Sequence, residues 1–166
     1  MNYIGIDNGI SGAIAQLNPD GALKSWHAMP TQKTRKGNEV NAASVFALLR
    51  AARDESFKQY KGSITVIIEE PGGSKSAKAA SSMAGSFHAI RAVLEVMRVR
   101  YHRITPQAWQ KNILHCKAGD TKPAALSKAR QLWPDELWLE TERCRKPHDG
   151  AIDAALIAEY GRVNNL

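Results

Sequence analysis

The segment Ile64-Thr65-Val66-Ile67-Ile68 constrains the fold more than any other part of the chain. Its residues are all β-branched and almost all apolar, so they favour an extended conformation with neither face turned to water. A strand of this kind is typical of a sheet that is covered by helices on both faces. The sequence therefore predicts an α/β protein with this segment in the middle of its sheet.

The hydrophobic patterns on either side of this strand predict one domain over residues 1–166. A turn signal, Asn18-Pro19-Asp20-Gly21, joins two of the strands that precede it, and Asn41 is expected to cap a helix. The expected elements are strands at 3–8, 13–17 and 22–28, a loop at 29–40, a helix at 41–60, the strand 64–68, a helix ending near 98, a strand at 99–105, and helices at 106–114, 121–133 and about 147–163. This order, βββ-α-β-α-β-α with further helices, predicts a mixed five-stranded sheet flanked by helices.

The composition favours a basic intracellular protein. The formal net charge is +7 and the pI is about 9.6, which favours a polyanionic partner such as a nucleic acid. No apolar run approaches the ~20 residues that a membrane span needs, so no membrane association is expected. Two cysteines, Cys116 and Cys144, are too few for a disulfide framework, and we expect a cytoplasmic location.

Acidic residues follow two of the predicted core strands. Asp7 ends the strand that contains Ile4-Gly5-Ile6, and Glu69 follows the strand 64–68. Strands that are linked by a helical crossover are usually parallel, so their carboxyl ends lie at the same edge of the sheet. Two acids that are buried side by side repel each other unless a cation lies between them. Asp7 and Glu69 are therefore candidate metal ligands.

A third acidic cluster opens the last predicted helix. Asp149 and Asp153 are four residues apart, which places them on one face of that helix. Oxygen ligands without clustered Cys or His suit Mg²⁺ or Mn²⁺ better than zinc. Any one of these acids alone is more often an ordinary turn or surface residue, but together they favour a site for one or two Mg²⁺ ions.

Four motifs resemble the RuvC-type Holliday-junction resolvases of the RNase H-like superfamily. Ile4-Gly5-Ile6-Asp7-Asn8-Gly9 is similar to their IGIDPG opening, with Asn8 where proline is usual. Residues 66–70 are similar to their second catalytic strand, and residues 149–154 to the start of their C-terminal acidic helix. Residues 104–111, Ile-Thr-Pro-Gln-Ala-Trp-Gln-Lys, are similar to the segment between, especially in phage-encoded relatives. The motifs are short, but they cover nearly the whole chain in the same order.

The resemblance implies a homodimeric endonuclease that resolves four-way DNA junctions by metal-dependent phosphodiester hydrolysis, in a bacterial cell or a phage-infected host. Asp7, Glu69, Asp149 and Asp153 would bind two Mg²⁺ ions, with Mn²⁺ as a possible substitute. Asp149 lies four residues before Asp153 where the bacterial enzymes have three, so His148 is an alternative ligand. Two other functions stay open: a related nuclease for flaps or RNA–DNA hybrids, and a non-catalytic nucleic-acid-binding relative.

Basic residues are expected around the same edge of the sheet. Lys75 and Lys78 follow the Glu69 strand, and Lys111 and Lys122 match positions that resolvases use to hold the phosphate backbone. The predicted loop 29–40 adds Lys33, Arg35 and Lys36. Bacterial resolvases carry an aromatic residue shortly after the catalytic Glu to open the junction, whereas this chain has Pro71-Gly72-Gly73 there.

The long helix that ends near residue 98 carries two stripes. One stripe is expected to cover the sheet and comprises Met83, Phe87, Ile90, Leu94 and Met97. The second consists of small or apolar residues and comprises Ala79, Ser82, Ser86, Ala89, Val93 and Val96. It would face either a partner subunit or a neighbouring element of the same chain. Trp26, Trp109, Trp133 and Trp138 are expected to be mostly structural.

Overall fold

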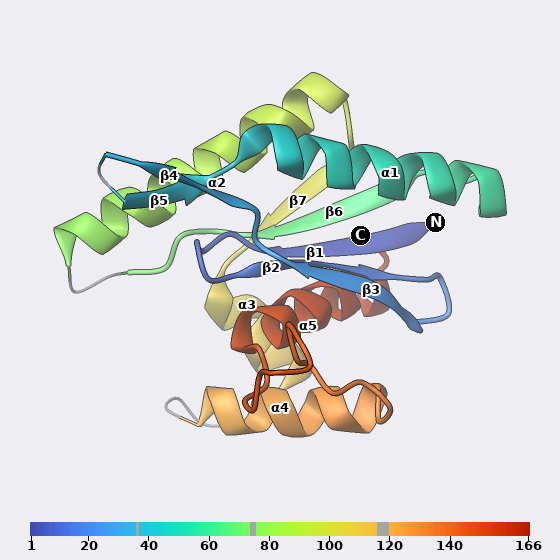
Figure 1. The fold of residues 1–166 in the computed structure, drawn as a ribbon. Coiled ribbons are helices and arrows are strands. Elements are labelled where there is room, and N and C mark those ends of the chain that lie inside the picture. Colours follow the sequence, from blue (N-terminus) through green and yellow to red (C-terminus); the bar gives the residue numbers. More distant parts are fainter. Residues whose placement is uncertain (36, 74–75, 116–119) are drawn as a thin grey trace.

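A computed structural model describes residues 1–35, 37–73, 76–115 and 120–166. It has three layers, with a twisted sheet between two groups of helices (Figure 1). The elements in the described residues are β1 (Asn2–Asp7), β2 (Ala13–Leu17), β3 (Leu23–Ala28), β4 (Thr31–Thr34), β5 (Gly37–Val40), α1 (Ala42–Tyr60), β6 (Ile64–Glu69), α2 (Ala77–Met97), β7 (Tyr101–Ile104), α3 (Pro106–Ile113), α4 (Thr121–Leu132) and α5 (Asp149–Val163).

The central sheet has five strands in the order β3-β2-β1-β6-β7, and it is a mixed sheet, as predicted. β1 pairs with β2 in antiparallel orientation and with β6 in parallel orientation, and β6 is parallel to β7. The register places Ile6 opposite Ile68. The carboxyl ends of β1 and β6 therefore lie next to each other at one edge of the sheet, which is the edge to which both arrows point in Figure 1.

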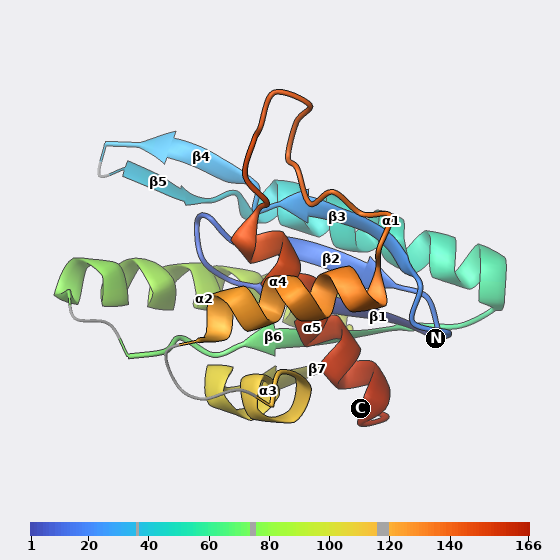
Figure 2. The same ribbon diagram turned by 90° about the horizontal axis from the view of Figure 1, so that it is seen from below.

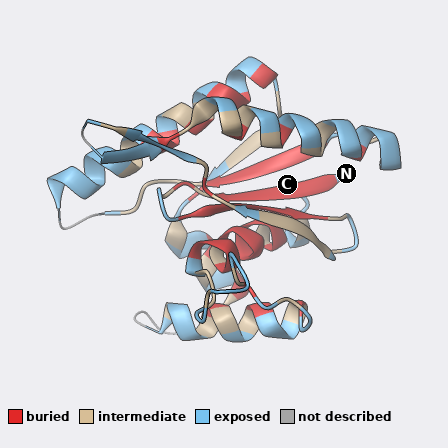
Figure 3. Cartoon of the chain, in the orientation of Figure 1, coloured by how far each residue is buried: buried red, intermediate tan, exposed pale blue. Residues whose placement is uncertain are grey.

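The two faces of the sheet bury separate apolar cores. α1 and α2 cover one face, with Val45, Leu49, Ile90 and Leu94 among the fully buried residues. The other face is covered by α5, with α3 and α4 outside it (Figures 1 and 2). Figure 3 shows that β1, β2, β6 and α5 are almost entirely buried. The five β-branched residues of β6 are all buried, as the pattern of residues 64–68 predicted.

Local sequence signals explain where several helices begin. Asn41 caps α1 by accepting a hydrogen bond from the Ser44 amide at 3.1 Å, and Thr105 caps α3 by accepting one from the Ala108 amide at 3.3 Å. Pro106 then occupies the first turn of α3, where a proline costs no hydrogen bond. α3 therefore begins directly after β7 and stays close to the carboxyl end of the sheet.

A glycine allows α5 to lie directly on the central strand. A side chain at Gly5 would collide with the main chain of Ala154 and Ala158, so α5 could not pack at this distance with any larger residue at position 5. This close approach fixes the position of the whole helix relative to β1. The acidic start of α5 is thereby brought to the end of β1.

One predicted element is wrong, and the start of one helix differs by two residues. Residues 29–40, predicted to be a loop, contain the hairpin β4–β5, in which Thr31 pairs with Val40 and Thr34 with Gly37. The pattern was missed because, apart from Val40, the strand residues are polar or glycine and do not alternate with apolar ones. The last helix begins at Asp149 rather than near Pro147, because His148 is the capping residue.

Three of the four tryptophans are buried, as expected: Trp109, Trp133 and Trp138 are at most 7% exposed, while Trp26 is half-buried.

Cys144 is not in a disulfide, and Cys116 lies outside the described residues. In the part of the chain that the structure describes, we find no helix with the length and apolar character needed to cross a membrane.

Candidate metal and nuclease site

Asp7 and Glu69 are the last residues of adjacent parallel strands. Asp7 ends β1 and Glu69 ends β6, and both side chains are largely shielded from solvent. The Asp7 carboxylate accepts a hydrogen bond from the Gly9 amide at 3.1 Å, which holds the turn after β1. The amide side chain of Asn8, which is 2% exposed, donates to the main-chain oxygen of Glu69. Asn8 therefore ties the ends of the two strands together.

Asp153 joins them from α5. It lies one turn into the helix. The negative charge of Asp153 raises the pKa of Glu69, and the charge of Asp7 raises the pKa of Asp153. A side chain at Gly150 would lie 2.6 Å from the Cα of Gly12 and 2.7 Å from the main-chain oxygen of Ser11. The glycine therefore lets the start of α5 touch the β1–β2 turn, which brings Asp153 to Asp7.

Asp149 lies at the rim of this cluster. Its side chain is 60% exposed, and its Oδ2 atom pairs with Lys122 Nζ at 2.7 Å. Its charge acts on Asp153. Asp7, Glu69 and Asp153 thus form the buried part of the predicted set, and Asp149 is its exposed member.

Burial raises the pKa of all three carboxyl groups, and neighbouring negative charges raise it further at Glu69 and Asp153. Burial and then the charges of Asp7 and Asp153 raise the pKa of Glu69 to about 8, against a hydrogen bond from Trp109. Burial and then the charges of Asp7 and Asp149 raise the pKa of Asp153 to about 7. Burial also raises the pKa of Asp7, although the Gly9 amide and His148 oppose the shift. At neutral pH the three groups cannot all be ionised at low cost without a cation.

This arrangement fits a hard divalent cation by its chemistry. The buried ligands are all carboxylate oxygens, the donors that Mg²⁺ and Mn²⁺ prefer. A cation among them would turn the mutual repulsion into attraction. In the described residues no three His, Cys, Asp or Glu side chains are already placed to hold one ion, so the carboxylates would have to close around it.

Trp109 is a site residue that sequence reasoning did not find. Its indole Nε1 donates a hydrogen bond to Glu69 Oε2 at 3.1 Å, and its side chain is only 1% exposed. The indole therefore fixes the orientation of the Glu69 carboxylate from within the core. The sequence did contain one signal for it. Trp109 is a large aromatic side chain with an N–H donor on α3, and α3 directly follows β7, the strand next to β6.

Replacing this donor should loosen the site without emptying the core. Trp109→Phe keeps an aromatic ring but leaves Glu69 without its side-chain partner. We expect about a tenfold to hundredfold weaker affinity for Mn²⁺, a size typical of groups that orient metal ligands. Isothermal titration calorimetry with Mn²⁺ measures this directly.

The matched control is Trp138→Phe. Trp138 is equally buried at 1% exposure, but its Nε1 atom has no hydrogen-bond partner among the described residues. Both variants should lose similar amounts of packing, so only the Trp109 variant should lose Mn²⁺ affinity. Equal Mn²⁺ affinities in the two variants would mean that the indole hydrogen bond does not position Glu69.

His148 and Glu70 have structural partners. His148 Nδ1 accepts a hydrogen bond from the Ala151 amide at 3.1 Å and so caps α5, while its ring lies 5.5 Å from that of Trp26. Glu70 pairs with Arg103 at 3.6 Å. In His148 only Nε2 stays available to a ligand, so its role as an alternative metal ligand is narrowed to that atom.

Several of the predicted basic residues are exposed in the part of the chain that the structure describes. Lys122 contacts Asp149, and Lys111 is exposed near the end of α3. Lys78 is exposed in the first turn of α2, and Lys33 and Arg35 are exposed on the β4–β5 hairpin. Lys36, Lys75 and Lys117 lie outside the described residues.

The two predicted stripes of α2 differ in how far their residues are buried. Phe87, Ile90, Leu94 and Met97 are buried against the sheet as expected. In the second stripe Ser86 and Val93 are also buried within the monomer, whereas Val96 is 77% exposed. Of the two alternatives for this stripe, packing within the same chain therefore holds for Ser86 and Val93, and a contact of the stripe with a partner subunit stays a prediction.

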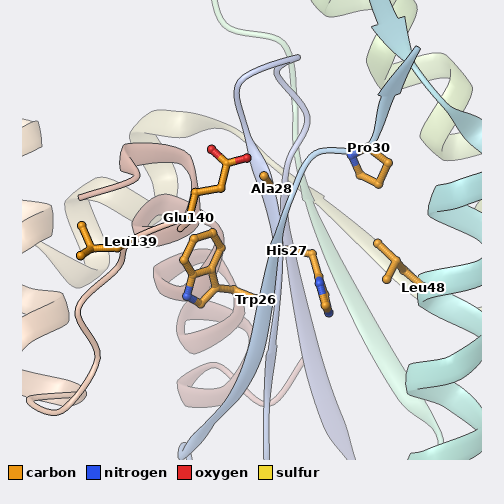
Figure 4. Close-up of a pocket in the computed structure, with 7 residues that line it drawn as sticks. All are labelled: Trp26, His27, Ala28, Pro30, Leu48, Leu139 and Glu140. Carbon is orange, nitrogen blue, oxygen red and sulfur yellow. The ribbon is translucent and has the colours of Figure 1, made fainter. Parts of the chain in front are cut away.

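A hollow of about 460 Å³ lies beside the edge strand β3, away from the carboxylates (Figure 4). Trp26 and His27 point to opposite sides of that strand, towards Leu139 and Leu48 respectively. Trp26 also donates to Glu136 Oε1 at 3.4 Å. None of the four predicted site carboxylates lines this hollow, so it is separate from the candidate metal site.

Comparisons with known proteins identify the fold. No protein-family model and no curated protein sequence matches the chain. The structure of Thermus thermophilus RuvC is similar, with a TM-score of 0.57, 17% identity and coverage of 99% of this chain and 97% of RuvC. T. thermophilus RuvC in complex with a Holliday junction substrate gives a TM-score of 0.57, 16% identity and coverage of 99% and 96%.

A similar structure is also known from a eukaryote. The yeast mitochondrial Holliday junction resolvase Ydc2 gives a TM-score of 0.53 and 16% identity, over 96% of this chain and 76% of Ydc2. At such low identity the similarity concerns the arrangement of the backbone, and the character of a phage relative stays a prediction. The chain has the RNase H-like α/β fold of the RuvC-type Holliday-junction resolvases, as its sequence motifs indicated.

Proposed function

We propose that this protein is a metal-dependent endonuclease that cleaves four-way DNA junctions. The observation that carries the proposal is the meeting of Asp7, Glu69 and Asp153 at one edge of the sheet, in a fold that the chain shares with RuvC. One of the similar RuvC structures is a complex with a Holliday junction substrate, and the net charge of +7 on this chain suits a DNA partner.

The residues have distinct roles in this proposal. Asp7, Glu69 and Asp153 would hold two Mg²⁺ ions, with Mn²⁺ as a substitute, and Asp149 would complete the set from the rim. Bound ions of this kind supply a water of lowered pKa and stabilise the charge on the leaving oxygen. Trp109 orients the Glu69 carboxylate and the Gly9 amide orients that of Asp7, each by a hydrogen bond.

Lys122 is also part of the proposed site. Its ion pair with Asp149 keeps a positive charge beside the acidic cluster, where a phosphate of the substrate would otherwise meet only negative groups. Lys111 and Lys78 would contact the backbone further away, and Lys75 is proposed for the same role. Contacts of this type position DNA without reading its sequence.

Removal of either Lys111 or Lys122 should weaken DNA binding by a similar factor for junctions of any sequence. Lys111→Ala and Lys122→Ala should each lower the affinity for junctions of different sequence by similar factors, and should each flatten the slope of log K against log salt by about one unit. Fluorescence anisotropy at several salt concentrations measures both effects. A loss confined to one junction sequence would point to base contacts instead.

Two coordinated cuts require two active sites, so we propose that the enzyme acts as a homodimer. A two-fold dimer places two identical sites on one self-complementary assembly. The C-terminal half of α2 offers an exposed apolar position at Val96 for this contact. Sedimentation velocity with and without junction DNA determines whether the protein associates.

The decisive experiment compares labelled four-way junction, flap, RNA–DNA hybrid and plain duplex, each with Mg²⁺ and with EDTA. The proposal requires paired cuts in the junction that need Mg²⁺ and are abolished by EDTA. Preferred cleavage of flaps or hybrids would instead support the related-nuclease alternative. Binding without cleavage of any substrate would support a non-catalytic relative.

A further inference from the structure

A pocket of about 680 Å³ lies at the end of α1, next to the turn that leads into β6. It is lined by Arg53, Asp54, Phe57, Lys58, Lys61 and Gly62, among others. The turn lies against the start of the chain, since a side chain at Gly62 would be 3.6 Å from the Cα of Met1. The pocket is therefore at the amino ends of β1 and β6, at the edge of the sheet opposite to the candidate metal site (Figure 1).

Large apolar side chains gather at this pocket. Phe57 lines it and is 61% exposed. Met1 and Tyr60 are 37% and 39% exposed and flank Gly62, where a side chain would also lie 3.8 Å from the Cβ of Tyr60. Single apolar side chains on a surface are ordinary, whereas a group of them marks a surface that a partner covers. The end of α1 therefore has the apolar part of a binding surface.

The rim of the pocket is cationic. Arg53, Lys58 and Lys61 line it, together with one acidic residue, Asp54. The Asp54 carboxylate already pairs with Arg53 at 3.6 Å and with Arg50 at 3.7 Å. Within the described residues, neither Lys58 nor Lys61 forms an ion pair with an acidic side chain. The Lys61 Nζ atom instead lies 5.7 Å from the centre of the Phe57 ring.

The end of a helix explains only part of this arrangement. Cations in the last turn stabilise a helix because its C-terminus has a partial negative charge, and this accounts for Lys58 and Lys61. It does not account for the exposed Phe57 ring beside them. A phosphate backbone would use the cations, but the pocket lies at the edge of the sheet that is far from the carboxylates.

An apolar floor with a cationic rim is complementary to a peptide that carries both carboxylates and a large apolar side chain. We propose that this pocket docks an acidic segment of a partner protein, with an aromatic or aliphatic side chain of that segment seated against Phe57. The inference does not depend on the nuclease function, since a partner held here leaves the opposite edge of the sheet open.

The test is binding of a fluorescent peptide in which one phenylalanine stands between two pairs of aspartates, measured by fluorescence anisotropy. Lys58→Glu with Lys61→Glu should lower its affinity about tenfold or more, because both changes turn attraction at the rim into repulsion. The matched control is Lys33→Glu with Arg35→Glu, which changes the net charge equally at exposed positions of the β4–β5 hairpin. It should lower the affinity less than about threefold, because salt screens distant charges.

A second pair of variants tests the apolar part of the pocket. Phe57→Ser should weaken peptide binding about fivefold or more, since the loss of an aromatic anchor is among the most costly changes at an interface. Alanine in place of the phenylalanine of the peptide should cause a similar loss. The control is Leu137→Ser, which removes a side chain that is 73% exposed elsewhere and should bind the peptide like the wild type. Phe57→Ser should also cleave junctions like the wild type.

Two other occupants of the pocket give different results. Leu137 lies between the exposed acids Asp135 and Glu140, so a second copy of this chain is one of them. A wild type that associates in sedimentation velocity, while both serine variants are monomers, overturns the assignment in favour of that second copy. If the variant with both α1 lysines reversed lost affinity for junction DNA and kept its affinity for the peptide, nucleic acid would be the occupant.

The remaining outcomes decide the proposal itself. No binding of the peptide to the wild type at about 1 mM, equal losses in the two charge-reversed variants, or unchanged binding by Phe57→Ser each overturn it. Junction cleavage by the wild type would stand in all three cases. A wild type that binds the peptide as expected but cleaves no DNA would overturn the proposed nuclease function alone.

Discussion

Asp7→Asn and Asp153→Asn are each expected to reduce junction cleavage by about 10³-fold or more while leaving junction binding intact or tighter. Each change removes a negative charge that the metal needs, and the loss of one such preorganised group costs roughly that factor or more. Binding is retained because the substituted residues repelled the phosphate. Nicking assays with Mg²⁺ and anisotropy with Ca²⁺ measure the two effects. Cleavage within tenfold of the wild type for either variant would falsify the shared metal site.

Asparagine is a conservative replacement at position 7. Its side-chain oxygen can still accept the hydrogen bond that the Gly9 amide now donates to Asp7, so the turn after β1 should keep its shape. A loss of activity can therefore be assigned to the lost charge rather than to a collapsed turn.

A stability measurement supplies the control for this interpretation. In the folded protein the pKa values of Asp7, Glu69 and Asp153 lie above their ordinary values, so the folded state holds more protons than the unfolded state between about pH 4 and pH 8. Without divalent cations, stability should fall as the pH rises through that window. Asp7→Asn removes part of the repulsion and should raise the melting temperature at pH 8, by roughly 2–4 °C per kcal/mol.

Mg²⁺ should stabilise the wild type and Asp7→Asn to different extents. It should raise the melting temperature of the wild type at pH 8 more than that of Asp7→Asn, since a ligand that binds the folded state stabilises it by mass action. A lower melting temperature for Asp7→Asn without cations would show that Asp7 is held by favourable contacts rather than by repulsion.

The sheet and the buried acids could be predicted because both depend on residues that are close in sequence. The apolar runs before Asp7 and Glu69 define two strands, and the helix between them makes those strands parallel. Their ends then have to lie at one edge. The position of Asp153 followed from the resemblance, but its depth depends on contacts of Gly5 and Gly150 that no local pattern reveals.

What the sequence could not show were partners that are distant in the chain. The Trp109 indole reaches Glu69 across 40 positions, and the Asn8 amide reaches Glu69 across 61. The hairpin β4–β5 was missed for another reason. Apart from the buried Val40, its strand residues are polar or glycine and mostly exposed, so the alternation that marks a half-buried strand is absent.

Glu69→Gln is expected to be inactive, with cleavage reduced about 10³-fold or more, whereas Glu70→Gln should stay within tenfold of the wild type. Successive residues of a strand point to opposite faces. Glu69 meets Trp109 and the charges of Asp7 and Asp153, while Glu70 pairs with Arg103 in a partly exposed bridge of the kind worth about 0–1 kcal/mol. Glutamine at position 69 still offers an oxygen to the Trp109 indole, so the fold should survive.

The pair is a sharp test because both changes have the same chemistry and stand one residue apart. A nicking assay under identical Mg²⁺ concentrations ranks them. If Glu70→Gln were the inactive one, β6 would have to be shifted by one residue against β1, since such a shift exchanges the two faces of the strand. That shift would also replace the pairing of Ile6 with Ile68 and bury Glu70 beside Asp7. The ranking therefore tests the register of β6 and the composition of the metal site in one measurement.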